Sequence, residues 1–338
     1  MIKYKAQKII VIVGPTASGK SDLGIFLARK ISAIGGPTSG WRGAEIISVD
    51  SRQVYRGMDI GTGKVKKNSI KYKVLSIKGR RKDSEYYSDN IRHHLIDVVS
   101  PKKVFTVSDF KKLGQKAIND IQCRYKVPII VGGTGFYIDA LVYDLNFPQV
   151  PPNNLLRFNL NRITAEQLFN KLKKLDPQRA KTIDPHNKRR LIRALEIIDS
   201  IGKVPALNTK YEMLNTKYDV LWIGLKPKNL EKRIKLRLDK RLKQGMVREV
   251  KNLIISGVSR KRLYDFGLEY RQVSEYLASK KFKVKSEKNF KNSEYYKILL
   301  RDIVKYSKRQ MTWFKRNKEI HWVKNGREAQ KLTGDFVR

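Results

Sequence analysis

The sequence predicts an α/β protein with a parallel sheet, followed by a largely helical C-terminal part. Residues Lys8–Val13 (KIIVIV) form a continuous apolar run, as expected for a strand buried on both faces of a parallel sheet. A glycine-rich turn follows, and apolar residues then recur at helical spacing over Asp22–Ile31, which predicts a helix. From Ala165 onward the helical period dominates, so the second half of the chain is expected to be mostly α-helix.

Three further apolar runs complete the predicted sheet. Glu45–Val49 reads as a second strand, and Val127–Val131 reads as a third after the helical stretch Val107–Cys123. Val220–Leu225 is expected to return to the same sheet. Strand, helix and strand in succession, with apolar strands, form a βαβ pattern, so the first 145 residues are interpreted as a layered α/β domain.

The C-terminal half and two polar segments complete the predicted organisation. Residues 35–43 are rich in Gly, Pro and Ser, and residues 65–90 are read as a lysine-rich surface insertion. In the last long helix, a core-facing stripe is expected at Leu300, Val304, Ser307, Met311 and Phe314. The predicted helices are Gln167–Leu175, Lys188–Ser200, Leu230–Ile255, Tyr270–Ser279 and Tyr295–Arg316.

The charge balance is strongly basic. The 338 residues include 73 Lys and Arg against 31 Asp and Glu, a net charge of +42. Much of the surface must therefore carry positive potential, which attracts polyanions and favours their binding through counterion release. A generally basic proteome would produce the same excess, so charge alone suggests RNA as a partner without establishing it.

The single cysteine and the short apolar runs argue against a disulfide-bonded, zinc-binding or membrane-spanning protein. With Cys123 as the single cysteine, the chain can form neither an internal disulfide nor a cysteine-based zinc site. The apolar run Ile9–Val13 is too short for a signal or membrane segment. We therefore expect a soluble cytoplasmic protein without a membrane partner.

The segment after the first strand is a phosphate-binding motif. Residues 14–21 (GPTASGKS) match G-x-x-x-x-G-K-[ST] at every defined position, between a predicted strand and a predicted helix. The glycines let the backbone wrap a phosphate, the lysine reaches its outer oxygens, and the serine hydroxyl suits Mg²⁺. A P-loop NTPase-like core is thus expected, and ATPases, nucleotide kinases and enzymes that expel pyrophosphate all fit. The predicted ligands of the phosphate groups, which the resemblance described below makes those of a diphosphate, are Gly14, Thr16, Ala17, Ser18, Gly19, Lys20 and Ser21.

Two polar residues follow the other predicted strands. Asp50 comes directly after the second strand, and Thr134 lies in the Gly-Gly-Thr-Gly sequence after the third. Since ligands bind beyond the carboxyl ends of parallel strands, both are expected near the phosphate loop. Asp50 is a candidate base or magnesium partner, and Thr134 a hydrogen-bond donor to phosphate. Asp50 as a local cap and Gly-Gly-Thr-Gly as a simple tight turn are the alternative interpretations.

Seven segments together resemble one family. They are GPTASGKS, EIISVDSRQVYRGMDIGTGK, HHLID, PIIVGGTGFY, RRLIRALEI, GLEYRQV and KRQMTWF, in this order. From about Ile9 to Trp322 they look like the tRNA dimethylallyltransferases, also called tRNA isopentenyltransferases. The phosphate loop is shared with many proteins, whereas DSRQVYRGMDIGT and KRQMTWF are highly specific for this family.

The resemblance implies a reaction and its residues. A dimethylallyl group would pass from dimethylallyl diphosphate to N6 of the adenosine immediately 3′ of the anticodon of tRNA, with release of diphosphate. It implies Asp50 as the base, catalytic support from Lys20 and Thr134, Arg193 as a further diphosphate ligand, and Mg²⁺ on Ser21. The implied tRNA contacts are Asp50, Ser51, Arg52, Gln53, Arg189, Arg190, Leu191, Ile192, Arg193, Phe266, Gly267, Leu268, Glu269, Tyr270 and Arg271.

The resemblance also divides the chain. It implies a P-loop α/β core over residues 1–143, a helical insertion over 144–186 that embraces the anticodon stem-loop, and a remainder over 187–338 with basic C-terminal helices. Seven Lys and Arg lie between Arg301 and Lys318, which suits contact with RNA phosphates. For Trp313 and Trp322 a packing role is favoured over stacking on bases. A monomer is expected.

Three other functions would account for only part of this sequence. A small-molecule P-loop kinase would share the phosphate loop but would leave the basic C-terminal helices and KRQMTWF unexplained. A prenyltransferase acting on free adenine nucleotides would not need an RNA-sized basic surface. A non-catalytic RNA-binding protein would have no reason to keep Lys20, Ser21, Asp50 and Thr134 together.

Overall fold

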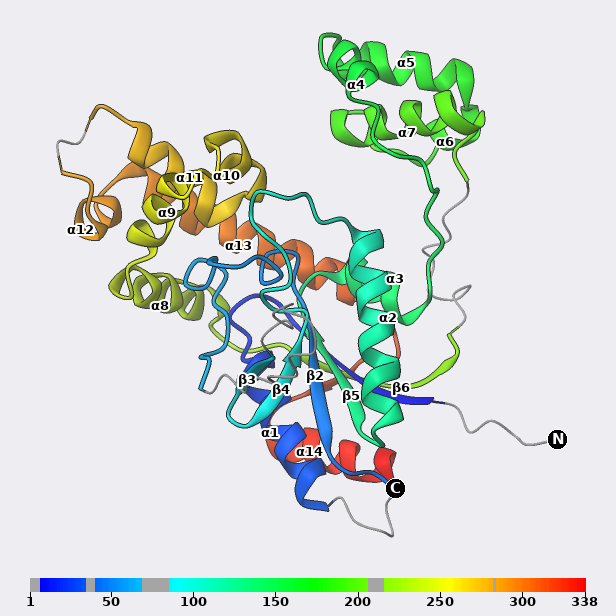
Figure 1. Ribbon diagram of the computed structural model, residues 1–338, viewed down its shortest axis with the longest axis vertical. Helices are drawn as coiled ribbons and strands as arrows, with labels where there is room; N and C mark the ends of the chain where they lie inside the picture. The colour runs from blue at the N-terminus through cyan, green and yellow to red at the C-terminus, as the bar shows by residue number, and fades with distance from the viewer. Residues whose placement is uncertain (1–6, 35–39, 69–84, 206–215, 282–283) are drawn as a thin grey trace, which may run out of the picture. The chain divides into compact units, whose positions relative to one another are not determined.

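The contacts between residues divide the chain into two units. The computed structural model describes residues 7–34, 40–68, 85–205, 216–281 and 284–338. One unit comprises Met1–Asp144 and Asn215–Arg338, and the other comprises Leu145–Leu214 (Figure 1). Each unit has its own hydrophobic core.

A single sheet organises the first unit. Among the described residues it has seven strands, in the order β3-β4-β2-β5-β1-β6-β7. All neighbouring pairs are parallel except β3 with β4. The carboxyl ends of β1, β2 and β5 therefore meet at one edge, where α/β proteins bind ligands. The strands are β1 (Gln7–Val13), β2 (Ala44–Val49), β3 (Tyr86–Ser88), β4 (Ile91–His94), β5 (Val127–Gly132), β6 (Tyr218–Leu225) and β7 (His321–Val323).

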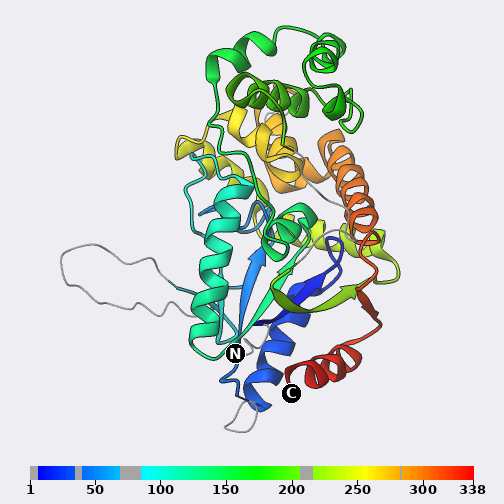
Figure 2. The ribbon, with the colours of Figure 1, turned by 90° about the vertical axis from the view of Figure 1, so that its right-hand side faces the viewer.

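Helices cover both faces of this sheet. Ile10 and Ile12 of β1 belong to one core cluster with residues of α1 (Lys20–Ile34) and α14 (Gly326–Val337). Side chains alternate along a strand, so Ile9 and Val11 face the opposite side and are equally buried. The helix α2 (Val107–Cys123) packs against β2 and β5, and α3 (Gly135–Val142) against α2. Figure 2 shows α14 beside α1, after the chain has passed from α13 through β7.

The rest of the first unit is a helical subassembly with its own core. Tyr270, Tyr276 and Phe290 are fully buried there, together with Met58 from the segment after β2. This packing fixes the segment after β2 against the helices. They are α8 (Leu230–Lys243), α9 (Met246–Ile255), α10 (Arg260–Phe266), α11 (Leu268–Ala278), α12 (Glu287–Lys291) and α13 (Glu294–Phe314).

Two predicted helices differ in detail. Leu230–Ile255 was predicted as one helix, but Gly245, with φ of 96°, separates α8 from α9. Only glycine enters this backbone region at little cost. In α13 the predicted stripe is offset, because Leu300, Val304 and Met311 are only partly buried. The buried positions are Tyr296, Leu299, Ile303, Ser307, Gln310 and Phe314.

The two polar segments are described in part. Residues 35–39 and 69–84 lie outside the described residues. The end of the predicted 65–90 insertion is not a surface loop, since Tyr86–Ser88 forms strand β3. It pairs antiparallel with β4, and the Tyr86 and Ser88 side chains are buried.

The second unit is a small helical bundle. Its core contains Leu168 and Leu172 of α5 together with Leu191 and Leu195 of α7. The predicted insertion ended at residue 186, but the unit extends to Leu214, because the apolar face of α7 completes this core. Its helices are α4 (Asn154–Leu160), α5 (Ala165–Leu175), α6 (Pro177–Ala180) and α7 (Lys188–Ile201).

Candidate active site

The loop between β1 and α1 has the geometry that a phosphate requires. Gly14 has φ of 156°, and a Cβ there would lie 2.8 Å from the Leu225 carbonyl oxygen. Ala17 and Gly19 have positive φ values of 62° and 94°. The backbone thus turns tightly before α1, whose first N–H groups and positive end face the space that the loop encloses. Such an arrangement of backbone N–H groups suits an anion.

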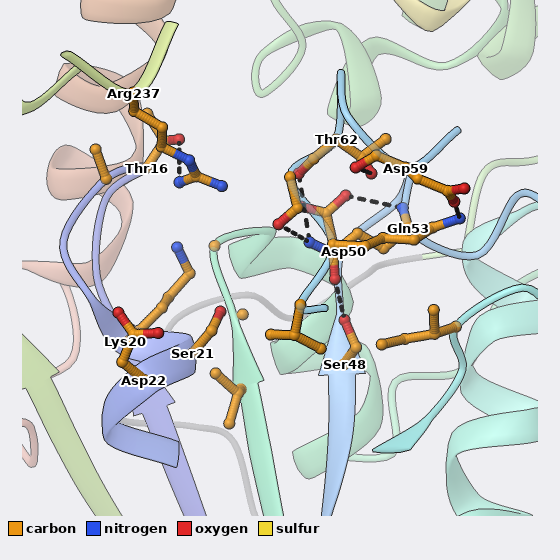
Figure 3. Close-up of a pocket in the computed structure, with 18 of the residues that line it drawn as sticks. Thr16, Lys20, Ser21, Asp22, Ser48, Asp50, Gln53, Asp59, Thr62 and Arg237 are labelled. Carbon is orange, nitrogen blue, oxygen red and sulfur yellow. Dashed lines mark hydrogen bonds and ion pairs between the residues drawn. The ribbon is translucent and has the colours of Figure 1, made fainter. Parts of the chain in front are cut away.

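A pocket of about 990 Å³ opens beside this loop (Figure 3). The phosphate loop lines one side, and Figure 3 shows Asp50 and Gln53 across from Lys20 and Ser21. Gly132 and Gly133, at the end of β5, also line the pocket, and so do residues of α8 and α13. Of the predicted site residues, the pocket is lined by Thr16, Ala17, Gly19, Lys20, Ser21, Asp50 and Gln53.

Asp50 caps the turn after β2 and also lines the pocket. Its Oδ1 accepts hydrogen bonds from the backbone N–H groups of Arg52, at 2.8 Å, and Gln53, at 3.3 Å. These bonds hold the carboxylate at the end of β2, and Oδ2 takes no part in them. The residue is partly buried and lines the pocket. The turn therefore fixes a carboxylate next to the phosphate loop.

Three arginines of α8 line the same pocket as Asp50. Arg233, Arg237 and Arg241 are spaced by four residues, so they share one helix face, and all three line the pocket. The Arg233 Nε donates to the carbonyl oxygen of Ala17 at 2.8 Å, and the Arg237 Nη1 lies 3.5 Å from the Thr16 Oγ1. These contacts hold α8 against the phosphate loop.

Lys20 shares this cationic environment. The pKa of its ammonium group is lowered to about 8, first by burial and then by the neighbouring cations Arg237 and Arg241, while Asp50 acts in the opposite direction. Burial and the Arg241 guanidinium also lower the pKa of Arg237. Cations crowded around a pocket are stabilised when an anion enters, so the site is suited to a ligand with several negative charges.

The arginine row was missed by the sequence analysis. Leu230–Ile255 was interpreted only as a helix, with no role for Arg233, Arg237 or Arg241. Their spacing of four residues was the available signal. Lysines are interspersed along the same helix, so the spacing alone could not show which face meets a ligand.

The two segments predicted to contact RNA in the first unit lie side by side. The Arg52 Nε donates to the Phe266 carbonyl oxygen at 2.8 Å, and its Nη2 donates to that of Asp265 at 3.3 Å. Phe266 and Tyr270 are buried, so their side chains support the segment from inside. Arg271 stacks on Tyr264. The remaining members of these segments are Ser51, Gly267, Leu268 and Glu269, the last paired with Arg241.

The third predicted RNA segment belongs to the second unit. Leu191 and Ile192 are core residues of α7 and are unsuited to contact RNA through their side chains. The Arg193 guanidinium binds Glu196 and the Val150 carbonyl oxygen. Because these partners occupy it within its own unit, the contacts do not support Arg193 as a diphosphate ligand. Arg189 and Arg190 lie on the exposed side of α7.

Thr134 lies at the start of α3 and is partly buried. Its side chain is hydrogen-bonded to that of Tyr306, a pocket residue of α13. The preceding Gly132 and Gly133 line the pocket, whereas Thr134 does not. A direct bond from Thr134 to a bound phosphate stays a prediction.

Comparison with known proteins identifies the family. Residues 53–317 match the sequence profile described as IPP transferase. The chain belongs to this family. It is 37% identical to the curated tRNA dimethylallyltransferase of Alkaliphilus oremlandii, over 94% of this chain and 91% of the relative. For the tRNA dimethylallyltransferase of Anoxybacillus flavithermus the identity is 35%, over 94% and 90%. The resemblance inferred from the seven motifs is confirmed.

Solved structures support the fold of this IPP transferase. A full-length tRNA isopentenylpyrophosphate transferase from Bacillus halodurans superposes with a TM-score of 0.63 at 30% identity, over 98% and 97% of the two chains. A eukaryotic dimethylallyltransferase, described as acting on tRNA, gives 0.66 at 26% identity, over 91% and 70%. The predicted P-loop NTPase-like core is confirmed. None of the helices in the described ranges combines the length and apolar character that crossing a membrane requires.

Proposed function

We propose that this IPP transferase moves a dimethylallyl group from dimethylallyl diphosphate to N6 of the adenosine immediately 3′ of the tRNA anticodon. The observation that carries the proposal is the pocket in which Asp50 faces a phosphate loop and a row of three arginines. A base and a polyanion cradle in one pocket suit displacement of diphosphate by a weak nucleophile. The names of the relatives support tRNA as the acceptor.

The residues have distinct tasks in this reaction. The adenine N6 attacks the allylic C1, the C1–O bond breaks, and its electron pair leaves with diphosphate. The N6 lone pair is delocalised into the ring, so Asp50 assists by accepting the N6 proton as the new bond forms. Negative charge grows on the departing oxygens, where the loop amides, Lys20 and Arg237 stabilise it. The product is N6-dimethylallyladenosine plus diphosphate.

The residues present fit a magnesium ion. Ser21 and Asp22 begin α1 and line the pocket with hydroxyl and carboxylate oxygens, the ligands that Mg²⁺ prefers. Within the described ranges no group of three His, Cys, Asp or Glu residues could hold a metal alone. Ser21 would therefore hold Mg²⁺ together with diphosphate oxygens and water. The ion would neutralise part of the leaving-group charge.

The charge distribution supports RNA binding. The exposed face of α13 carries Arg301 and Lys305, and the chain has a large excess of basic residues. An adenine stacked in an anticodon loop cannot reach the partly buried Asp50, so we expect the base to flip out of its loop. The second unit, with the exposed Arg189 and Arg190, is proposed to embrace the anticodon stem-loop.

The direct test is transfer of a labelled dimethylallyl group. The protein is incubated with labelled dimethylallyl diphosphate, Mg²⁺ and an anticodon stem-loop RNA, with free AMP and ATP as parallel acceptors. We expect label in the RNA, and its loss when the target adenosine is replaced. Label in the free nucleotides alone would instead indicate a nucleotide prenyltransferase, and the absence of label in every acceptor would favour the P-loop kinase.

The lowered pKa of Lys20 predicts the pH dependence of donor capture. Below pH 8 the ammonium is protonated and attracts diphosphate, and above pH 8 the free enzyme loses this charge. We expect kcat/KM for dimethylallyl diphosphate to fall as pH rises through about 8. Lys20→Arg, which stays charged, should move this decline to higher pH. An unchanged profile in Lys20→Arg would show that another group titrates.

The basic face of α13 predicts a salt effect. Replacing Arg301 and Lys305 by Ala should weaken binding of all tRNAs alike and reduce the slope of log K against log salt by about 1 per lost phosphate contact. Filter binding at several salt concentrations measures it. Arg327 and Lys331 of α14 have the same spacing and exposure, so their replacement is a matched control. Equal slopes for both pairs would mean that α13 faces away from RNA.

A further inference from the structure

A buried glutamine of α13 joins the two loops that end β1 and β5. Gln310 is only 7% exposed although it lies in a highly basic helix. Its Oε1 accepts the backbone N–H of Thr16 at 2.8 Å, and its Nε2 donates to the Gly133 carbonyl oxygen at 2.7 Å. One amide therefore bonds the phosphate loop on one side and the Gly-Gly-Thr-Gly segment on the other.

The glycines of this segment leave room for α13. A Cβ at Gly133 would lie 2.3 Å from the Gln310 Nε2, and a Cβ at Gly135 would lie 2.1 Å from the Trp313 ring. The Trp313 Nε1 also donates to Asp139 of α3 at 3.0 Å. Neither glycine has a positive φ, so backbone conformation does not require them. The close approach of the α13 side chains Gln310 and Trp313 is what requires glycine at both positions.

The contact continues into the arginine row. Thr16, whose N–H is held by Gln310, places its Oγ1 3.5 Å from the Arg237 Nη1. Gln310 itself lines the pocket. A shift of Thr16 would thus move both the first half of the phosphate loop and the guanidinium of Arg237.

We infer that Gln310 is a positioning residue that holds the phosphate loop in its diphosphate-binding conformation through Thr16. The inference rests on the proposed function for the identity of the diphosphate as the leaving group. The quantity that it predicts is the affinity of the phosphate loop for diphosphate. The amide satisfies Thr16 N–H, so that the later amides of the loop and Lys20 remain directed to the ligand. Through the same hydrogen bond, α13, the helix proposed to contact tRNA, is connected to the phosphate loop that would hold the leaving group.

The alternative is that Gln310 only stabilises the fold. Gln310→Met keeps the length and burial of the side chain but removes both hydrogen bonds. Trp313→Phe is the matched control, because it removes one hydrogen bond of α13, to Asp139, without touching Thr16. Both variants should lower the melting temperature. A purely structural role predicts that neither changes diphosphate affinity in the folded protein.

The test is titration of the full-length protein with inorganic pyrophosphate and Mg²⁺ by calorimetry, below the melting temperature of each variant. We expect Gln310→Met to weaken binding about 10-fold, as for loss of hydrogen bonds that hold an anion site, and Trp313→Phe to match wild type. Equal affinities for Gln310→Met and wild type would overturn the inference. Because no prenyl transfer is needed, this result is independent of the proposed reaction.

A second variant reaches the same contact from the other side. Gly133→Ala would push the Gln310 amide away while leaving it in the chain. It should reproduce the loss of affinity, and the double variant should be no worse than either single change, because both act on one contact. Fully additive losses would refute the coupling. This variant also decides the question if Gln310→Met does not fold.

Discussion

Asp50→Asn is expected to lower the rate of prenyl transfer about 10²–10⁴-fold, the usual contribution of a general base. The asparagine Oδ1 can still accept the N–H groups of Arg52 and Gln53, so the turn after β2 should persist. What is lost is the group that receives the N6 proton. Single-turnover transfer with saturating tRNA measures this step separately from binding.

The affinity for tRNA should be almost unchanged in Asp50→Asn. Asp59→Asn is the matched control, since Asp59 lines the same pocket and carries the same charge, but is exposed and paired with Lys64. We expect the control to lose much less activity than Asp50→Asn. Strongly impaired tRNA binding with normal single-turnover chemistry in Asp50→Asn would contradict its assignment as the base.

The predicted site residues that the structure brings together in one pocket come from local sequence patterns. The phosphate loop needs only consecutive residues, because glycine conformations and the following helix create the anion site wherever the segment occurs. Asp50 could be placed near it since strand ends of a parallel sheet converge, and the pocket contains both. These predictions required the order of elements and no knowledge of long-range packing.

The parts that were missed depend on contacts between distant segments. Arg237 meets Thr16, and Gln310 meets both Thr16 and Gly133, across more than 170 residues. A periodic pattern shows that a helix has a basic or apolar face, but not which partner the face meets. The offset stripe of α13 has the same cause, since the buried polar Gln310 is satisfied by loop backbone that no local pattern reveals.

The second unit ends later than the predicted insertion, for a related reason. The motif RRLIRALEI was assigned to the core on its likeness to the family, yet Leu191 and Leu195 of α7 complete the second unit's own core. An amphipathic helix indicates that it needs a partner without naming it. Within this unit Glu196 pairs with Arg157 and with Arg193, the arginine that was predicted to bind diphosphate.

Arg237→Met is expected to affect function and stability with opposite signs. Removing a preorganised cation from the leaving-group site should lower kcat/KM for dimethylallyl diphosphate about 10²–10³-fold. In the absence of ligand, however, Arg237 is a cation whose pKa is lowered by burial and by Arg241, and it lowers the pKa of Lys20 in turn. Losing that repulsion should leave the melting temperature of the free protein unchanged or raise it.

The contrast separates a ligand-binding arginine from a structural one. Lys235→Met, on an exposed face of α8 away from the pocket, removes the same charge and should change neither kcat/KM nor diphosphate affinity. Pyrophosphate should also raise the melting temperature of Arg237→Met less than that of wild type, because ligand stabilisation scales with affinity. If Arg237→Met instead destabilised the free protein and retained full diphosphate affinity, the residue would serve packing, and the anion would have to be held by the loop, Lys20 and the other two arginines.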